Sequence, residues 1–273
     1  MDISDFSTKI SILFSQKKCL SSKSWGMEFP DAVQNIIKIA ENLNSDEIDL
    51  FYDLISRYTI CDFAAYNALT EKALTNVLKT IPNDTYKVYV FPLLKPSDLQ
   101  KTKSSQFVLY IYESLILRIT HGIPSFLFNK LSELLQEPIN SNYRVLLVDD
   151  FVGTGKTAIL CADDYVKNKN VNKESIIIST FYSMESGLQN VKNEGYNIVT
   201  LNTMQRGITD HFSQNELSAK YKIIDEIEKR HGIPKTYKRG LDQSEALLTL
   251  MRTPNNTFPM FWSEKFITPP FRR

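Results

Sequence analysis

Asp149 and Asp150 are adjacent carboxylates that follow an apolar run, Val145–Val148, and precede a loop rich in glycine and threonine. The apolar run has the composition of a buried strand, and a helical pattern begins at Thr157. Backbone N–H groups at the start of a helix are unpaired and lie at the positive end of its dipole, so such a turn binds anions. The candidate phosphate-binding residues are Gly153, Thr154, Gly155, Lys156 and Thr157.

The carboxylates and the loop allow more than one interpretation. A strand-to-helix turn without a ligand needs only glycine and threonine, but adjacent carboxylates at the end of a buried strand repel each other and require a partner. A P-loop for a nucleoside triphosphate would contain Gly155, Lys156 and Thr157, but it has glycine where this chain has Asp150. Its magnesium-binding carboxylate would have to be Asp225, which the spacing of the apolar residues places on a helix.

A third interpretation comes from a resemblance. The run VLLVDDFVGTGKT, residues 145–157, is similar to the signature of the type I phosphoribosyltransferases, whose loop binds 5-phosphoribosyl 1-diphosphate (PRPP). The resemblance implies that Asp149 and Asp150 are catalytic residues that hold the ribose hydroxyls, directly or through Mg²⁺. It also implies that the loop wraps the 5′-phosphate. Gly153 and Lys156 depart from the commonest form of the signature, which often has Thr and Gly at these two positions.

The form of the loop resembles a narrower group, the phosphoribosyltransferase-like proteins of bacterial conflict and anti-phage operons, some of them encoded beside retron reverse transcriptases. Two further segments look like that group: a Lys-Ser element before a helix, and the segment Pro254–Trp262, in which Pro-Asn-Asn-Thr precedes an apolar run. The resemblance covers about residues 86–262. It implies an antiviral role and a partner encoded in the same operon or belonging to a retron.

Two more elements complete the expected site. A PRPP enzyme needs a cradle for the departing pyrophosphate, and the loop after the first core strand offers Lys103, Ser104 and Ser105 beside a helix N-terminus. A solvated lysine loop is the alternative. The adjacent amides Asn255 and Asn256 are candidates for binding the acceptor through paired donors and acceptors, although Pro-Asn-Asn also suits a simple turn.

The composition limits the function classes. The chain has 273 residues, a formal net charge of +1 and 42% hydrophobic residues, so it carries no direct nucleic-acid signature. Its most apolar run contains Glu113 and Arg118, which argues against a membrane span, and its N-terminus lacks a signal-peptide pattern. Three scattered cysteines without metal-ligand spacing indicate reduced thiols. We therefore expect a cytoplasmic protein.

The sequence around the loop that follows Asp150 predicts an α/β fold. Strands and helices alternate from about residue 86, which predicts a doubly wound, mostly parallel sheet. The resemblance implies that this sheet is of the type I phosphoribosyltransferase-like kind. The expected strands are Tyr86–Leu94, Val145–Val148, Ser175–Phe181 and Ile198–Leu201, with a closing strand within Ala246–Trp262. A helix is expected over Phe126–Leu135, and another is expected to begin at the capping pair Ser213 and Glu216.

The chain is expected to divide near residue 82. Residues 1–82 read as an N-terminal helical region, in which Ser45 caps one helix, and residues 83–273 as the phosphoribosyltransferase-like domain. The expected function is PRPP binding with transfer of the phosphoribosyl group to an unknown acceptor and release of pyrophosphate. The alternatives are a non-catalytic regulator that binds PRPP or a nucleotide, and a P-loop-like ATPase.

Overall fold

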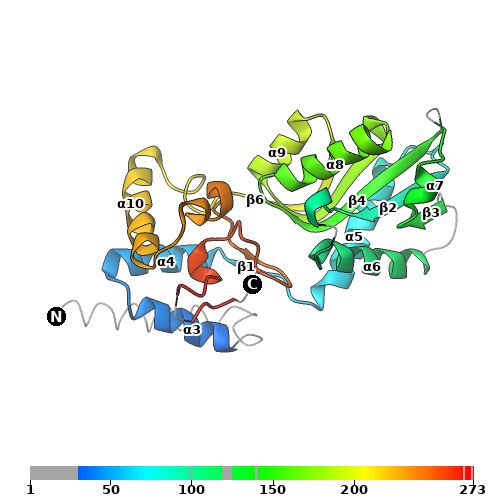
Figure 1. Cartoon of the computed structure of the whole chain (residues 1–273). Helices are drawn as coiled ribbons and strands as arrows, with labels where there is room; N and C mark the ends of the chain where they lie inside the picture. The colour runs from blue at the N-terminus through cyan, green and yellow to red at the C-terminus, as the bar shows by residue number, and fades with distance from the viewer. Residues whose placement is uncertain (1–29, 99, 119–124, 139–140, 267, 272) are drawn as a thin grey trace. The chain divides into compact units, whose positions relative to one another are not determined.

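The computed structural model describes residues 30–98, 100–118, 125–138, 141–266, 268–271 and 273. They form two compact units (Figure 1). Residues 62–204 make up a sheet unit, and the described residues up to Cys61 join those from Gln205 onward in a second unit. Within the described residues, no helix is long and apolar enough to cross a lipid bilayer.

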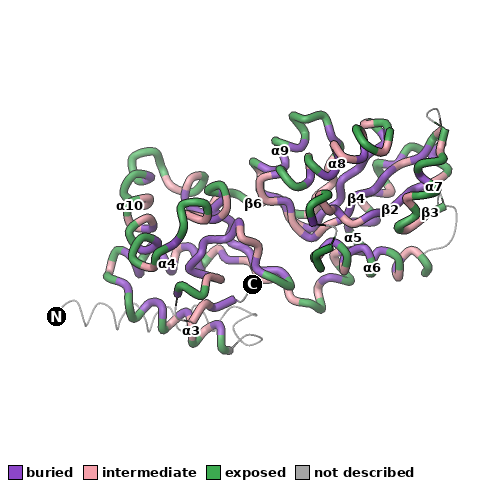
Figure 2. The backbone as a smooth tube through the Cα atoms, in the orientation of Figure 1, coloured by how far each residue is buried: buried purple, intermediate pink, exposed green. Residues whose placement is uncertain are grey.

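The sheet unit is built on five strands in the order β3-β2-β4-β5-β6, and every neighbouring pair is parallel. This confirms the predicted α/β fold with a parallel sheet. The central strands are rich in Val, Ile and Leu and are buried along most of their length, as parallel strands covered on both faces should be (Figure 2). The strands are β2 (Lys87–Pro92), β3 (Ser125–Phe128), β4 (Tyr143–Val152), β5 (Ile176–Met184) and β6 (Asn197–Met204).

Helices cover both faces of this sheet. On β5, Ser179 bonds Tyr112 of α6 on one face, whereas the preceding Ile178 packs in one core cluster with Ala162 of α8 on the other. Helix α5 shares the face of α6, and α9 shares the face of α8. The helices of this unit are α5 (Ala65–Thr80), α6 (Ser104–Ile116), α7 (Leu131–Leu134), α8 (Lys156–Lys169) and α9 (Glu185–Asn193), with short 3₁₀ turns η1 (Pro96–Asp98) and η2 (Lys173–Ser175).

The second unit is mostly helical and has its own core. Phe51, Ile224, Phe258 and Phe261 are fully buried in it. Ser213 and Glu216 form the predicted capping box at the start of α10. The elements are α3 (Pro30–Ala40), α4 (Ser45–Ser56), β1 (Thr59–Ile60), α10 (Gln214–Arg230), η3 (Lys235–Tyr237), η4 (Leu241–Gln243), β7 (Leu248–Thr249) and η5 (Pro259–Phe261).

Three local predictions were wrong. The segment Phe126–Leu135 is not one helix, because its first residues form β3 and pair with β2, and only α7 is helical. Asn44, and not Ser45, caps α4, since its side chain forms a reciprocal capping box with Glu47. The strand within Ala246–Trp262 does not close the main sheet; it is β7, which pairs with β1 in the second unit.

The compact units do not follow the expected boundary at residue 82. Helix α5 lies within the sheet unit, because its buried side, including Tyr66 and Val77, packs on β5 and β6. Residues 205–273 leave the sheet unit and share a core with α3 and α4. Chain segments that are distant in sequence therefore build the second unit together.

Glu137 anchors the end of the sheet opposite the candidate site. Its carboxylate is largely buried and accepts hydrogen bonds from the Lys87 ammonium at 2.7 Å, from the Tyr86 and Tyr89 hydroxyls, and from Ser141 Oγ at 3.2 Å. Burial alone would raise the pKa of this group. The four donors outweigh burial and lower the pKa of Glu137 to about 2.

Replacing Glu137 with Gln is expected to lower the free energy of unfolding by about 1–3 kcal/mol at neutral pH, because the charge-assisted bonds are lost. A depressed folded-state pKa contributes stability above the ordinary value of 4.5, and that stability is lost as pH falls towards 2. Urea unfolding of the wild type and Glu137→Gln should therefore give free energies of unfolding that converge as the pH is lowered. An equal difference at neutral pH and at about pH 3 would contradict this account.

Candidate functional site

The acidic pair lies at the carboxyl end of β4. The strand continues through both carboxylates to Val152, three residues past Asp149, whereas the sequence placed its end at Val148. Ser104 Oγ, at the start of α6, lies 3.1 Å from Asp149 Oδ1 and 2.8 Å from Asp150 Oδ1. The buried Tyr66 hydroxyl of α5 donates to Asp150 Oδ2 at 2.7 Å. Two helices on one face of the sheet thus fix the orientation of the pair.

The two carboxylates cannot both carry a full charge at low cost. Burial, followed by repulsion from the Asp150 carboxylate, raises the pKa of Asp149 well above its ordinary value. The Asp150 backbone N–H and Ser104 Oγ oppose this shift by donating to Asp149. A cation or a pair of ligand hydroxyls would relieve the repulsion, so the pair is suited to binding either.

The raised pKa of Asp149 predicts a pH-dependent cost to stability. A group whose pKa is raised on folding contributes stability that is complete below the ordinary value of 3.8 and is lost as pH rises through the folded-state value. At neutral pH, Asp149→Asn should therefore raise the free energy of unfolding, because it removes a buried charge that the Asp150 carboxylate repels. Urea unfolding from pH 4 to pH 8 checks this, and a destabilised variant at neutral pH would contradict it.

The loop after β4 turns sharply into α8. Gly155 has a φ of +81° and occupies the cap position, so it supplies no side-chain acceptor to the first N–H groups of the helix. Lys156 and Thr157 lie exposed in the first turn. The loop therefore presents backbone donors, a hydroxyl and an ammonium group at the positive end of the helix dipole, which together suit a phosphate.

Helix α9, which follows the neighbouring strand β5, packs against this loop. A Cβ atom built on Gly187 would lie 2.0 Å from the Gly153 carbonyl oxygen, and one on Gly155 would lie 2.8 Å from the Gly187 carbonyl oxygen. Asn190 Nδ2 donates to the Thr154 carbonyl at 3.1 Å. The loop conformation thus depends on glycine at a position inside a helix, where glycine costs about 1 kcal/mol relative to alanine.

A cluster of three lysines surrounds Asp98 in the loop after β2. The buried Asp98 carboxylate lies 2.7 Å from Lys101 Nζ, 3.2 Å from Lys103 Nζ and 4.0 Å from Lys95 Nζ. The hydrogen bond from Lys101, followed by that from Lys103, lowers the pKa of Asp98. One buried anion therefore gathers three ammonium groups beside the amino end of α6. The loop keeps a net positive charge, which would attract a second anion.

The structure distributes the remaining predicted site residues differently. Of Lys103, Ser104 and Ser105, only Lys103 joins the lysine cluster. Ser104 faces the acidic pair, and Ser105 is buried, with no hydrogen-bond partner for Oγ among the described residues. Asn255 and Asn256 belong to the second unit, where the buried Asn256 amide donates to Ser244 Oγ at 2.9 Å and helps hold a loop.

The donor set fits a magnesium ion that arrives with its ligand. Among the residues that the structure describes, no group of three or more His, Cys, Asp or Glu side chains could hold a metal ion alone. Mg²⁺ commonly binds one or two carboxylates and takes its other ligands from water and substrate phosphates. Asp149 and Asp150 supply the protein's part of such a set.

Three residues near the candidate site were not predicted: Tyr66, Asp98 and Gly187. Tyr66 and Asp98 act through contacts that only the folded chain creates. Gly187 did leave a signal, because a glycine inside a predicted helix usually has a packing reason. The prediction that Asp225 lies on a helix is confirmed, since it is part of α10.

Comparison with known proteins finds a matching family and similar solved structures. A model of the family PRTase-CE matches residues 22–273, which is most of the chain. No curated protein matches the sequence.

Two similar solved structures are phosphoribosyltransferases. The orotate phosphoribosyltransferase from Aeropyrum pernix is 16% identical, with 52% of this chain and 72% of that chain covered and a TM-score of 0.32. The adenine phosphoribosyltransferase from Thermoanaerobacter pseudethanolicus is 15% identical, with 52% and 83% covered and a TM-score of 0.30. The match of the family model along most of the sequence is the stronger finding: this chain is phosphoribosyltransferase-like and belongs to the PRTase-CE family.

Proposed function

We propose that the sheet unit binds PRPP with Mg²⁺ and transfers its phosphoribosyl group to an acceptor, releasing pyrophosphate. The observation that carries this proposal is the arrangement around the end of β4. The acidic pair is followed by a glycine-rich loop and the start of α8, whose first N–H groups suit an anion, and the lysine cluster follows the adjacent strand β2. Ligands of open parallel sheets bind beyond the carboxyl ends of the strands, where these groups lie.

Each part of PRPP has a counterpart in this arrangement. The first turn of α8 would hold the 5′-phosphate, and Asp149 and Asp150 the ribose hydroxyls. The ammonium groups of Lys95, Lys101 and Lys103 would bind the pyrophosphate and stabilise the charge that grows on it as the bond to C1′ breaks. Bound Mg²⁺ would supply further charge neutralisation on the leaving group. The carboxylates would stabilise positive charge on the ribose, and Tyr66 would keep Asp150 oriented.

A pyrophosphate-release assay with Mg²⁺, PRPP and a panel of bases tests the transferase proposal. Release that depends on an acceptor supports it. Binding of PRPP without release across the panel would instead favour the regulator that binds and does not turn over. ATP hydrolysis abolished by Lys156→Ala would favour the P-loop-like ATPase, for which Lys156 would be the phosphate-binding lysine.

We further propose that the protein acts in the cytoplasm as an effector of an anti-phage or conflict system, with an operon-encoded or retron partner. This rests on the resemblance of the DDFVGTGKT loop and the Pro254–Trp262 segment to that group. Cys161 is free and buried, as suits a reducing compartment. A reverse transcriptase or defence gene beside the coding gene supports this role, and a nucleotide-salvage operon contradicts it.

A further inference from the structure

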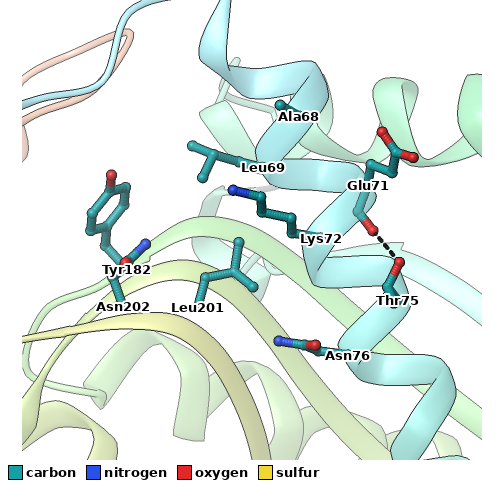
Figure 3. A pocket seen from close by; sticks show the side chains of 9 residues that line it. All are labelled: Ala68, Leu69, Glu71, Lys72, Thr75, Asn76, Tyr182, Leu201 and Asn202. Atoms are coloured by element: carbon teal, nitrogen blue, oxygen red, sulfur yellow. Dashed lines mark hydrogen bonds between the residues drawn. The ribbon is translucent and has the colours of Figure 1, made fainter.

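The acidic pair is covered, although the surface near it is open. A groove lies between α5 and the ends of β5 and β6, and most of the side chains that line it, such as Glu71 and Lys72, are exposed (Figure 3). Tyr182, which also lines the groove, pairs in register with Phe151, the residue after Asp150. Asp150 itself is only 4% exposed. The groups that cover this carboxylate therefore determine when it can contact a ligand.

Two hydroxyl groups cover Asp150. Tyr66, in the first turn of α5, donates to Asp150 Oδ2 at 2.7 Å, and Ser104, the first residue of α6, donates to Asp150 Oδ1 at 2.8 Å. The ring of Tyr66 is fully buried and packs against the rings of Phe107 and Phe181, so this residue is a fixed support. Ser104 is half-buried. Rotation about its Cα–Cβ bond can therefore carry the hydroxyl away from Asp150 while α6 stays in place.

Ser104 Oγ occupies the point at which the two carboxylates converge. It lies 3.1 Å from Asp149 Oδ1 and 2.8 Å from Asp150 Oδ1. A ligand hydroxyl that contacts both carboxylates, or a Mg²⁺ ion that bridges them, would need this same point, because both take carboxylate oxygens as partners. Neither can bind there while Ser104 Oγ remains, so the pair is closed by a residue of its own chain.

A ligand with two neighbouring hydroxyl groups can replace this contact with a better one. The Ser104 hydroxyl has one hydrogen, so it donates to only one of the two carboxylates at a time. The vicinal hydroxyls of a ribose supply two hydrogens, one for Asp149 and one for Asp150. The serine thus relieves the repulsion between the carboxylates in part, and the ligand would relieve it more fully.

We propose that Ser104 is an internal competitor of the ligand: its hydroxyl takes the place of a ribose hydroxyl on the empty acidic pair and is displaced when PRPP binds with Mg²⁺. This rests on the proposed PRPP site and adds a control on its affinity. It replaces the expectation that Ser104 binds the departing pyrophosphate, since its hydroxyl contacts two carboxylates, which repel an anion. Every binding event loses the Ser104 contact, so the site binds more weakly than its carboxylates and loop alone would allow.

Isothermal titration of the full chain with PRPP, ribose 5-phosphate and inorganic pyrophosphate, each with Mg²⁺, tests this role. Ser104→Ala should bind PRPP and ribose 5-phosphate about fivefold more tightly than the wild type, because the contact that these ligands must displace is absent. Pyrophosphate does not need the acidic pair and should bind both proteins equally. Ser114→Ala is the matched control on α6, where the hydroxyl donates to the Tyr110 carbonyl, and it should change none of the three affinities.

Thermal unfolding gives a second measurement that a purely structural role would not satisfy. The Ser104 contact exists only in the ligand-free protein, so Ser104→Ala should melt below the wild type without ligand. The two proteins should melt at the same temperature when both are saturated with PRPP and Mg²⁺, because the tighter binding offsets the lost contact. A serine that only supports the fold would lower the melting temperature in both states.

The outcomes separate this proposal from the proposed function. If the wild type binds PRPP and Ser104→Ala binds it equally or more weakly, Ser104 is not a competitor and the PRPP site stands. Weaker pyrophosphate binding by Ser104→Ala would also overturn the proposal, since it would assign the hydroxyl to the leaving group. If the wild type does not bind PRPP, the proposed function fails and the role of Ser104 fails with it.

Discussion

Asp150→Asn is expected to reduce the rate of pyrophosphate release about 100-fold or more without unfolding the protein. The asparagine side chain has the shape of aspartate; its amide oxygen can accept from one of the Tyr66 and Ser104 hydroxyls, and its NH₂ group can donate to the oxygen of the other. It has lost the charge that would bind the ribose hydroxyls with Mg²⁺ and stabilise a cationic ribose in the transition state. The loss should appear mainly in kcat, because the charge acts most strongly in that state.

Two further variants give this result its meaning. Asp84→Asn makes the same change at an exposed aspartate that bonds Asn142 outside the candidate site, and it should leave the rate unchanged. Tyr66→Phe removes only the hydroxyl that orients Asp150, so it should cost about tenfold, less than the loss of the charge. If Asp150→Asn released pyrophosphate at the wild-type rate, with Mg²⁺ and PRPP saturating, a catalytic role for this carboxylate would be excluded.

Gly187→Ala is expected to weaken PRPP binding about 100-fold, although Gly187 itself would touch no ligand. The added methyl group would lie 2.0 Å from the Gly153 carbonyl oxygen, so the loop must move away from α9. Gly155, whose φ is +81°, would move with it, and the N–H groups at the start of α8 would lose their alignment towards the phosphate. Titration of the variant with Mg²⁺ and PRPP measures the effect.

The neighbouring Ser186 provides a matched control for this variant. Ser186→Ala changes an exposed residue of the same helix and should bind PRPP like the wild type. Asn190→Ala removes one hydrogen bond to the Thr154 carbonyl, so a loss of about tenfold is expected. Wild-type affinity in Gly187→Ala would show that the loop conformation does not determine binding.

Local patterns predicted most elements of the sheet unit, because most of its strands contain short apolar runs. The helix over Glu185–Asn193 is one example, and in the second unit the capping box at Ser213 predicted the start of α10. The segment Phe126–Phe128 shows the limit of such patterns. It is apolar and short enough for either a helix or a strand, and only its pairing with β2, distant in sequence, makes it a strand.

The residues of the candidate site also differ in whether the sequence alone can predict them. The residues of the loop after β4 are consecutive, so their sequence pattern was sufficient to predict them as one site. Their supports come from α5, α6 and α9, and no local pattern links Tyr66 or Gly187 to Asp150. The organisation of the second unit could not be predicted for the same reason, because α3 and α4 share a core with residues more than 150 positions later.

Titration calorimetry with Mg²⁺ and PRPP tests the central claim, that the carboxylates and the loop after β4 form a ribose-phosphate site. The wild type should bind, and the double variant Asp149→Asn/Asp150→Asn should bind at least about 100-fold more weakly while melting at or above the wild-type temperature. Equal affinity of the two proteins, or no binding by the wild type, would contradict the account.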